Sequence, residues 1–331
     1  MKSIRKKSEN LRKDLEETIQ DFKVMGLDAE IKLGVYDIKT GLNVSINGNK
    51  SGWAASIIKL PVMIATLQET EKRRILLKEE LLVDHRFTLE QTDYVSMIPQ
   101  GAPISVGELL FYMIATSDNE ATNMLVDRIG GPQKVNECAR ELGLKRTMLG
   151  HLLCPNVPRY TSGFNRDGSN ITNPEDMAKL MRHLYEPSYS KLSSFVRRNS
   201  DIILSSTIPT FLKKGRFKDS KIKCKVGYIS DPVNGEDIHE VGIIDNRLIV
   251  CLMANKVKQD YSLDCSRRVG GGLFNREIYG SSIYRSNIPD ELDDIDLHFN
   301  PFRNSKIKQT PTVPKLYAKI MEIIGEHTQS D

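Results

Sequence analysis

The sequence contains a serine and a lysine at a spacing that can generate a nucleophile. Ser56-Ile57-Ile58-Lys59 opens an apolar stretch that predicts a helix over residues 56–73. Residues three apart share one face of a helix, so the Lys59 amine would lie one turn from the Ser56 hydroxyl. A neutral amine can take the hydroxyl proton there, and burial among apolar neighbours would lower its pKa. Alone, an S-x-x-K sequence is too short to identify an enzyme.

A second polar group, Ser117-Asp118-Asn119, precedes a helix predicted over residues 119–129. Two interpretations fit it. Taken alone, it is a helix cap, because these residue types are preferred there and Glu120 follows Ser117 by three residues, as in a capping box. Alternatively, the Ser117 hydroxyl relays a proton and Asn119 contacts a substrate amide.

A third pattern, Lys225-Val226-Gly227, lies in a strand predicted over residues 221–229. A glycine inside a strand often marks a bulge or the close approach of another backbone or ligand. The pattern alone therefore predicts only that something lies against this strand.

The elements that position these groups follow from apolar spacing. Strands are predicted at 30–37, 43–47, 221–229, 238–245 and 247–254, and helices at 3–24, 56–73, 105–115, 119–129, 132–142, 174–186 and 313–326. Asp245-Asn246 is expected to form a tight hairpin turn, and Asn173 is expected to cap its helix. Strands from both ends of the chain can pair in one antiparallel sheet. We expect an α+β fold, with the first and last helices on the sheet and an all-helical lobe beside it.

In this order, the three patterns resemble the signature of class A β-lactamases and penicillin-binding proteins. Residues 35–41, 104–110 and 119–131 also resemble segments of that family, and the resemblance covers about residues 15–255 and the last helix. It implies a β-lactamase/transpeptidase-like fold in a single domain, 1–331. The sheet lobe would take about 1–55 and 205–331, and the helical lobe about 56–204. Residues 256–312 carry no pattern that we can assign.

The resemblance also implies how a substrate would be attacked. Ser56 would attack a carbonyl to form an acyl-enzyme, and Lys59 would activate it. Ser117 would relay a proton to the leaving nitrogen. Lys225 would support that step and attract a substrate carboxylate.

Substrate binding is implied for the same region. Asn119 would contact the substrate amide, and the backbone N–H groups of Ser56 and Tyr228 would form an oxyanion hole next to Gly227. The family usually has threonine or serine where Val226 stands and a small hydroxyl where Tyr228 stands. Contacts to a substrate carboxylate are therefore not implied by these two positions.

A larger departure concerns release of the acyl group. Class A β-lactamases carry a glutamate that positions the hydrolytic water, before a helix start that here resembles residues 171–174. Residues 149–170 contain no glutamate, and Leu153 falls about where the base should be. His151 and Asp167 are candidates for a substitute base. Without one, acylation can proceed but efficient turnover of a β-lactam should not.

Three functions are therefore open. The first is a serine hydrolase that forms an acyl-enzyme with a β-lactam or a related amide or ester. The second is a cytoplasmic acyltransferase, peptidase or esterase that acts on a non-antibiotic metabolite. The third is a non-catalytic sensor or binding protein on the same fold. The joint presence of Ser56, Lys59, Ser117, Asn119 and Lys225 argues against the third, because a binder does not need all five.

Composition narrows the partners. Among 331 residues, 47 are basic and 43 acidic, a balance that does not favour nucleic acid. No apolar run is long enough to cross a membrane and no secretory leader is visible, so we expect a cytoplasmic protein unless a leader was removed. Five scattered cysteines, Cys138, Cys154, Cys224, Cys251 and Cys265, are expected to be free thiols. We expect no metal or cofactor and a small amide or ester substrate; the sequence does not indicate an oligomeric state.

Overall fold

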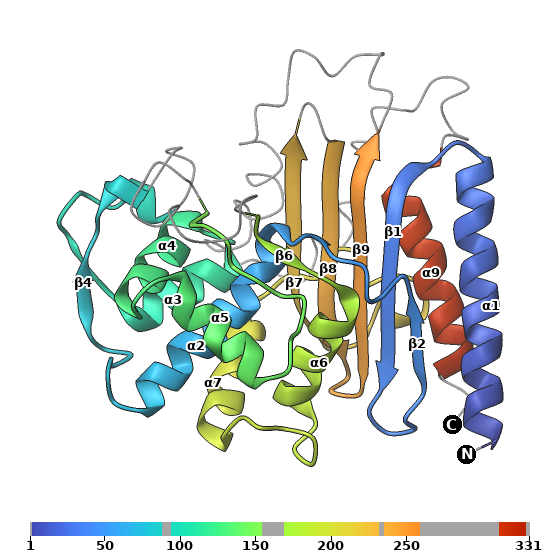
Figure 1. Cartoon of the computed structure of the whole chain (residues 1–331), viewed down its shortest axis with the longest axis horizontal. Coiled ribbons are helices and arrows are strands. Elements are labelled where there is room, and N and C mark those ends of the chain that lie inside the picture. Colours follow the sequence, from blue (N-terminus) through green and yellow to red (C-terminus); the bar gives the residue numbers. More distant parts are fainter. Residues whose placement is uncertain (1, 88–93, 154–168, 232–234, 259–310, 329–331) are drawn as a thin grey trace, which may run out of the picture.

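A five-stranded antiparallel sheet, in the order β2-β1-β9-β8-β7, forms the middle of the molecule (Figure 1). The computed structural model describes residues 2–87, 94–153, 169–231, 235–258 and 311–328. The strands are β1 (Asp28–Asp37), β2 (Asn43–Ile46), β7 (Ile222–Asp231), β8 (Gly235–Ile244) and β9 (Leu248–Lys258). Strand β1, from the start of the sequence, pairs with β9, from near its end. This pairing confirms the predicted α+β fold, in which strands from both ends of the chain form one antiparallel sheet.

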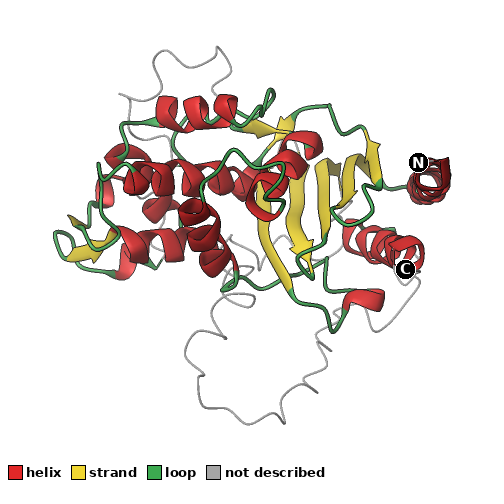
Figure 2. Cartoon of the chain, turned by 90° about the horizontal axis from the view of Figure 1, so that it is seen from below, coloured by secondary structure: helices red, strands yellow, loops and turns green. Residues whose placement is uncertain are grey.

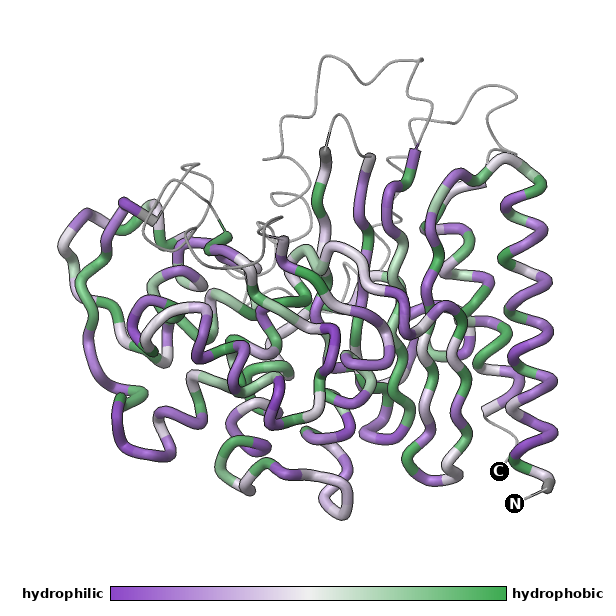
Figure 3. The backbone as a smooth tube through the Cα atoms, viewed as in Figure 1, coloured by the Kyte–Doolittle hydropathy of each residue, from purple (hydrophilic) through white to green (hydrophobic). Residues whose placement is uncertain are grey.

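Two terminal helices, α1 (Lys2–Val24) and α9 (Val313–Thr328), cover one face of this sheet (Figure 2). Their buried side chains recur at helical spacing, as in Leu11, Leu15 and Ile19 of α1. The central helices cover the other face. Because both faces are covered, β9 is apolar without interruption from Leu248 to Ala254. Figure 3 shows this concentration of hydrophobic residues in the inner strands.

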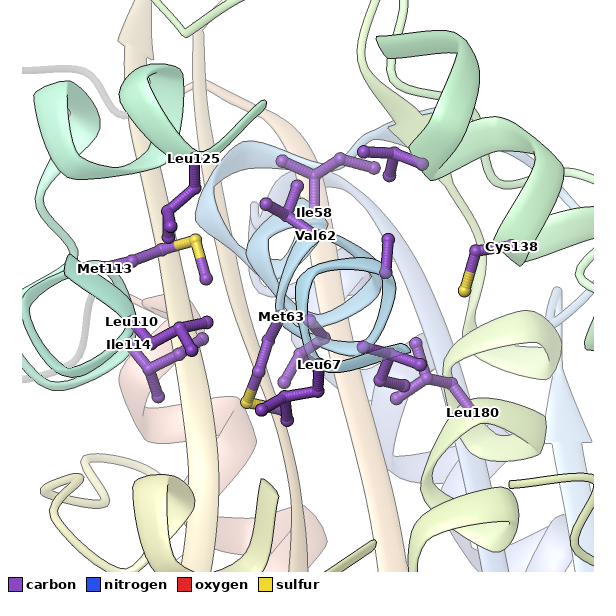
Figure 4. Close-up of a cluster of buried hydrophobic side chains, with 14 of the residues drawn as sticks. Ile58, Val62, Met63, Leu67, Leu110, Met113, Ile114, Leu125, Cys138 and Leu180 are labelled. Atoms are coloured by element: carbon purple, nitrogen blue, oxygen red, sulfur yellow. The ribbon is translucent and has the colours of Figure 1, made fainter. Parts of the chain in front are cut away.

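The helical side is built around α2 (Lys59–Glu71). The surrounding helices are α3 (Val106–Ala115), α4 (Asn119–Arg128), α5 (Pro132–Glu141), α6 (Pro174–Tyr185) and α7 (Ser194–Leu204). Figure 4 looks along α2 and shows side chains of its neighbours on several sides of it, including Leu110, Leu125 and Leu180. A helix that is buried all round needs apolar residues on every side, which explains the apolar run from Leu60 to Ala65.

Several predicted details are confirmed and others are refined. Asp245 and Asn246 both have positive φ, at 51° and 53°, as a two-residue hairpin turn requires. The Asn173 side chain caps α6 by accepting from the Asp176 N–H at 2.8 Å. The helix predicted over 56–73 begins instead as a 3₁₀ turn, η1 (Ala55–Ile58), before α2.

Short elements complete the described fold. Two strand pairs are formed by β3 (Gly52–Trp53) with β6 (Ile171–Thr172) and by β4 (Glu80–Leu82) with β5 (Pro103–Ser105). The 3₁₀ turns η2 (His85–Phe87), η3 (Val95–Met97) and η5 (Gly215–Phe217) lie in connections. These short elements were not predicted individually, because two- and three-residue elements show no periodicity. Helix α7 was not predicted either.

Other expectations have mixed outcomes. Cys138, Cys224 and Cys251 are buried free thiols, and burial raises the pKa of Cys138 to about 12. Cys154 and Cys265 lie outside the described residues. No helix in the described part of the chain combines the length and the apolar character needed to cross a membrane. The lobe boundaries near residues 55 and 205 stay a prediction.

The central position of α2 can be tested by a matched pair of leucine variants. Leu67 in α2 is 0% exposed, whereas Leu82 in β4 is 65% exposed. Leu67→Ala should lower the free energy of unfolding by about 2–5 kcal/mol, because it opens a cavity in a packed core. Leu82→Ala should change it by less than about 0.5 kcal/mol. Urea unfolding measures both, and equal losses would contradict a buried α2.

Candidate active site

Ser56 and Lys59 meet at the start of the central helix, as their spacing predicts. The Lys59 Nζ lies 3.2 Å from the Ser56 Oγ, within reach of proton transfer. The 3₁₀ turn η1 contributes to this contact, because side chains at i and i+3 nearly eclipse in such a turn. Lys59 is 0% exposed, so water does not compete for its amine.

The second group brings another hydroxyl to the same amine. Lys59 Nζ lies 3.1 Å from the Ser117 Oγ and 2.8 Å from the Asn119 Oδ1, and it also donates to the Ser117 carbonyl oxygen. The buried amine therefore lies between two serine hydroxyls. One comes from the turn before α2 and the other from the turn before α4.

The group does cap α4, but the capping side chain is that of Asp118; the capping box expected from Ser117 and Glu120 is not the cap of this helix. The Asp118 Oδ1 accepts from the Ala121 N–H at 2.7 Å, and its Oδ2 accepts from the Val95 N–H at 2.9 Å. Ser117 has a φ of +62°, a left-handed conformation that costs a residue with a Cβ about 1–2 kcal/mol. Asp118 fixes the turn on one side, which leaves the Ser117 side chain directed to Lys59.

The third pattern lies directly against η1. β7 is an edge strand of the sheet, and η1 packs on it. A Cβ added to Gly227 would lie 3.2 Å from the backbone nitrogens of both Ser56 and Ile57. This close approach explains why the strand has a glycine at that position.

Lys225 brings a second buried amine toward the first. It is 1% exposed, and its Nζ donates to the Val226 carbonyl oxygen at 3.0 Å. Burial lowers the pKa of Lys225 well below its usual value, and the positive charge of Lys59 lowers it further. The two lysines are therefore electrostatically coupled.

Tyr228 can contribute to the predicted oxyanion hole only through its backbone N–H. Its side chain packs toward the core under α1 and α9, and its hydroxyl donates to the Glu236 Oε1 at 2.8 Å. Burial raises the pKa of this hydroxyl to about 12. The substitution of a small residue by tyrosine therefore adds bulk on the face of the sheet away from Gly227 and Ser56.

The direction of the Tyr228 N–H follows from its strand. The Cys224 N–H donates to the Thr207 Oγ1 at 3.1 Å, outside the sheet. Backbone N–H groups two residues apart point to the same edge of a strand, and the register of β7 with β8 is continuous. The N–H of Tyr228 therefore points to the edge of β7 that does not pair with β8.

The segment expected to carry a deacylating base is described up to Leu153. The Leu153 N–H donates to the Oδ1 of Asn123, a fully buried residue one turn after Asn119 in α4. The Nδ1 of His151 lies 2.5 Å from the carbonyl oxygen of Leu152, so this ring nitrogen is engaged with the segment's own backbone. Asp167, the other predicted substitute, lies outside the described residues.

Buried asparagines that the sequence did not single out anchor this segment. Asn136 exchanges two hydrogen bonds with the backbone of Leu149, at 2.8 and 3.0 Å. Asn170 accepts from the backbone N–H groups of Gly150 and His151 through its Oδ1. An asparagine among apolar helix residues is the signal that could have indicated Asn123 and Asn136. Across the described ranges, no three His, Cys, Asp or Glu side chains gather as a metal site would need.

Two curated proteins are similar to this chain in sequence. Beta-lactamase CARB-4 of Pseudomonas aeruginosa is 27% identical over 172 residues, which are 50% of this chain and 56% of that protein. Beta-lactamase CARB-3 of the same species is 25% identical over 205 residues, covering 57% of this chain and 68% of that protein. The chain thus spans between about half and two thirds of the length of these relatives.

Two solved structures show the same fold. A leucine-to-glutamate mutant of PBP-A, solved as an acyl-enzyme complex with penicillin G, is 23% identical with a TM-score of 0.62 and covers 74% of this chain and 87% of its own. An ancestral class A beta-lactamase is 18% identical with a TM-score of 0.65 and covers 96% of this chain and 99% of its own. The family model described as the beta-lactamase enzyme family matches residues 11–274. The chain belongs to the beta-lactamase enzyme family.

Proposed function

We propose that the protein is a serine hydrolase that forms an acyl-enzyme on Ser56 with a β-lactam or a related amide or ester, and that it releases the acyl group slowly. The observation that carries this proposal is the Lys59 amine, which is buried and within 3.2 Å of both the Ser56 and the Ser117 hydroxyl oxygens. A nucleophile, a base and a second proton carrier are then in one hydrogen-bonded group.

Acylation follows from these positions. Lys59 takes the proton of Ser56 as the Ser56 oxygen attacks the substrate carbonyl. The negative charge that develops on the carbonyl oxygen is stabilised by the N–H of Ser56, at the start of η1, and by the outward N–H of Tyr228. The carbon–nitrogen bond then breaks, and Ser117 passes a proton from Lys59 to the leaving nitrogen. The buried amine of Lys225 is electrostatically coupled to that of Lys59, since the charge of Lys59 adds to burial in lowering the pKa of Lys225.

In the segment that the structure describes up to Leu153, no glutamate stands where the family has its deacylating base. Leu153 is tied through its backbone to Asn123, one turn of α4 away from Asn119, and its side chain cannot take a proton from water. At this position, therefore, no side chain would align a water to attack the ester on Ser56. We infer that the acyl-enzyme persists.

The persistent ester favours a second candidate function. An acyl group that water removes slowly can pass to another nucleophile, so an acyltransferase, peptidase or esterase acting on a non-antibiotic metabolite is the alternative. A cytoplasmic location for it stays a prediction from the sequence.

Intact-mass measurement over time tests the proposed function. The chain is incubated with a fluorescent penicillin and, separately, with a fluorophosphonate. A stoichiometric adduct that persists with the penicillin and is absent from Ser56→Ala supports a slowly released acyl-enzyme. Absence of an adduct with both probes, or labelling of Ser56→Ala, would contradict it.

Leu153 can be tested by adding the missing base. Leu153→Glu should accelerate loss of the penicillin adduct by roughly 100-fold, the lower end of the 10²–10⁴-fold that a general base typically contributes. Leu153→Gln has the same side-chain length without a basic carboxylate and should release the adduct as slowly as the wild type. Equal release rates for the two variants would show that Leu153 does not mark the site of the base.

The lowered pKa of Lys225 makes folding depend on pH. In the unfolded chain its pKa returns to about 10.5, so between the folded and unfolded values only the unfolded chain holds the proton. This contribution to stability is fully present above about 10.5 and is lost as pH falls through the folded pKa. Lys225→Met should therefore flatten the rise of unfolding free energy with pH between about 8 and 10.5. Urea unfolding across this range measures it, and parallel pH profiles for the two proteins would contradict the buried, coupled lysine.

A further inference from the structure

A buried polar group on the sheet lies under the segment that leads into Ser56. We call Lys32, Asp237, His239 and Asn255 the sheet cluster; they come from β1, β8 and β9, and each is at most 3% exposed. The short strand β3 crosses this cluster. A Cβ added to Gly52 would lie only 2.3 Å from the Asn255 Oδ1, so glycine permits the close approach.

Two members of the sheet cluster hold one backbone carbonyl. The Trp53 carbonyl oxygen lies 2.8 Å from the His239 Nε2 and 3.1 Å from the Asn255 Nδ2. A carbonyl oxygen can only accept, so the Nε2 of His239 carries the hydrogen. Burial lowers the pKa of His239 to about 4, which keeps the ring neutral near physiological pH.

The other two members orient Asn255. Lys32 Nζ lies 2.7 Å from the Asn255 Oδ1, and because an ammonium can only donate, the amide oxygen must face it. The amide nitrogen then donates one hydrogen to Trp53 and the other to the Asp237 Oδ1, at 2.8 Å. The amide of Asn255 is thus fixed on three sides.

His239 connects the two structures that meet at Ser56. It is the direct cross-strand partner of Gly227, the glycine that faces the Ser56 nitrogen. It also bonds to Trp53, three residues before Ser56. The side chain of His239 therefore links β7, the strand that carries Gly227, to the segment that carries Ser56.

The segment between these contacts is strained. Ala55 has a φ of +43°, and such a residue persists only where its neighbours over-determine it. Before it, Trp53 is held through its carbonyl and Ala54 through its N–H, which donates to the Asn170 carbonyl oxygen at 2.9 Å. After it, Ser56 is held against Gly227. If one of these contacts is lost, the backbone at Ala55 can relax from its positive φ, and Ser56 would then move.

We propose that His239 is a positioning residue for acylation: by donating to the Trp53 carbonyl it sets the place of the Ser56 hydroxyl relative to the free edge of β7. This proposal rests on the proposed role of Ser56 as nucleophile. The side chain of His239 itself touches neither substrate nor the reacting atoms.

Matched amide variants test the proposal. His239→Gln places an amide nitrogen at about the depth of Nε2 and keeps the donor. His239→Asn keeps a polar amide but stops short of Trp53. Asn255→Ser removes the second donor and leaves His239 in place, so a folding failure in one variant leaves another to measure. Ile243→Ala, a fully buried change on the same face of β8 two pleats away, is the control for loss of stability.

The first readout is the rate of adduct formation with a fluorescent penicillin over a range of concentrations. His239→Asn should lower the maximal acylation rate by about 10- to 100-fold with little change in half-saturating concentration, because a small misplacement of the nucleophile is costly in rate. Asn255→Ser should lower it less. His239→Gln and Ile243→Ala should stay within about threefold of the wild type.

The second readout does not depend on activity. Trp53 is the only tryptophan of the chain, so its fluorescence reports on this segment alone. Acrylamide should quench it more strongly in His239→Asn and Asn255→Ser than in the wild type, His239→Gln or Ile243→Ala.

The outcomes separate this inference from the proposed function. Wild-type acylation and quenching in His239→Asn would overturn the inference, as would a His239→Gln variant as slow as His239→Asn. A wild type that forms no adduct would overturn the proposed function, and the quenching of Trp53 would then decide the positional claim by itself.

Discussion

The buried amine of Lys59 is the interaction on which the site depends. It lies fully buried at the start of the central helix, and its partners include the hydroxyls of Ser56 and Ser117 and the amide oxygen of Asn119. These partners belong to two helix starts far apart in the chain. A buried lysine that lost them would leave an uncompensated polar group in the core. The same contacts that stabilise the junction of α2 and α4 therefore also place the Lys59 amine between two hydroxyls.

The sheet contributes further groups to the site beside the junction of α2 and α4. Edge strand β7 brings Gly227 against the Ser56 backbone and an outward N–H from Tyr228, and Lys225 brings a second buried amine that is electrostatically coupled to the first. Attack on a carbonyl and protonation of a leaving nitrogen are thus supported by both sides of the site. Leu153 gives no such support to release, because its backbone is anchored to Asn123 and its apolar side chain packs against the helical core.

Local features of the site were predictable from sequence, and relations between distant segments were not. The contact of Ser56 with Lys59 depends only on their spacing of three residues within one turn, so the sequence predicts it. The approach of Gly227 to Ser56 depends on the register of β7 and the packing of η1, and only the family resemblance indicated it. Ser117 was ambiguous because its local sequence fits a cap; the structure gives the cap to Asp118. His239 had no local signal, since a lone histidine in a strand acquires its role from a backbone carbonyl 186 residues away. The long helices and the sheet were predicted well, whereas β3 and β6 were too short to detect.

The central claim is that this chain acylates readily and deacylates slowly. Rapid mixing with a chromogenic cephalosporin measures both steps in one trace. The account predicts a burst of ring opening equal to one turnover per protein molecule, followed by a much slower steady rate. A linear trace with many rapid turnovers and no burst would contradict it, because release would then be at least as fast as attack.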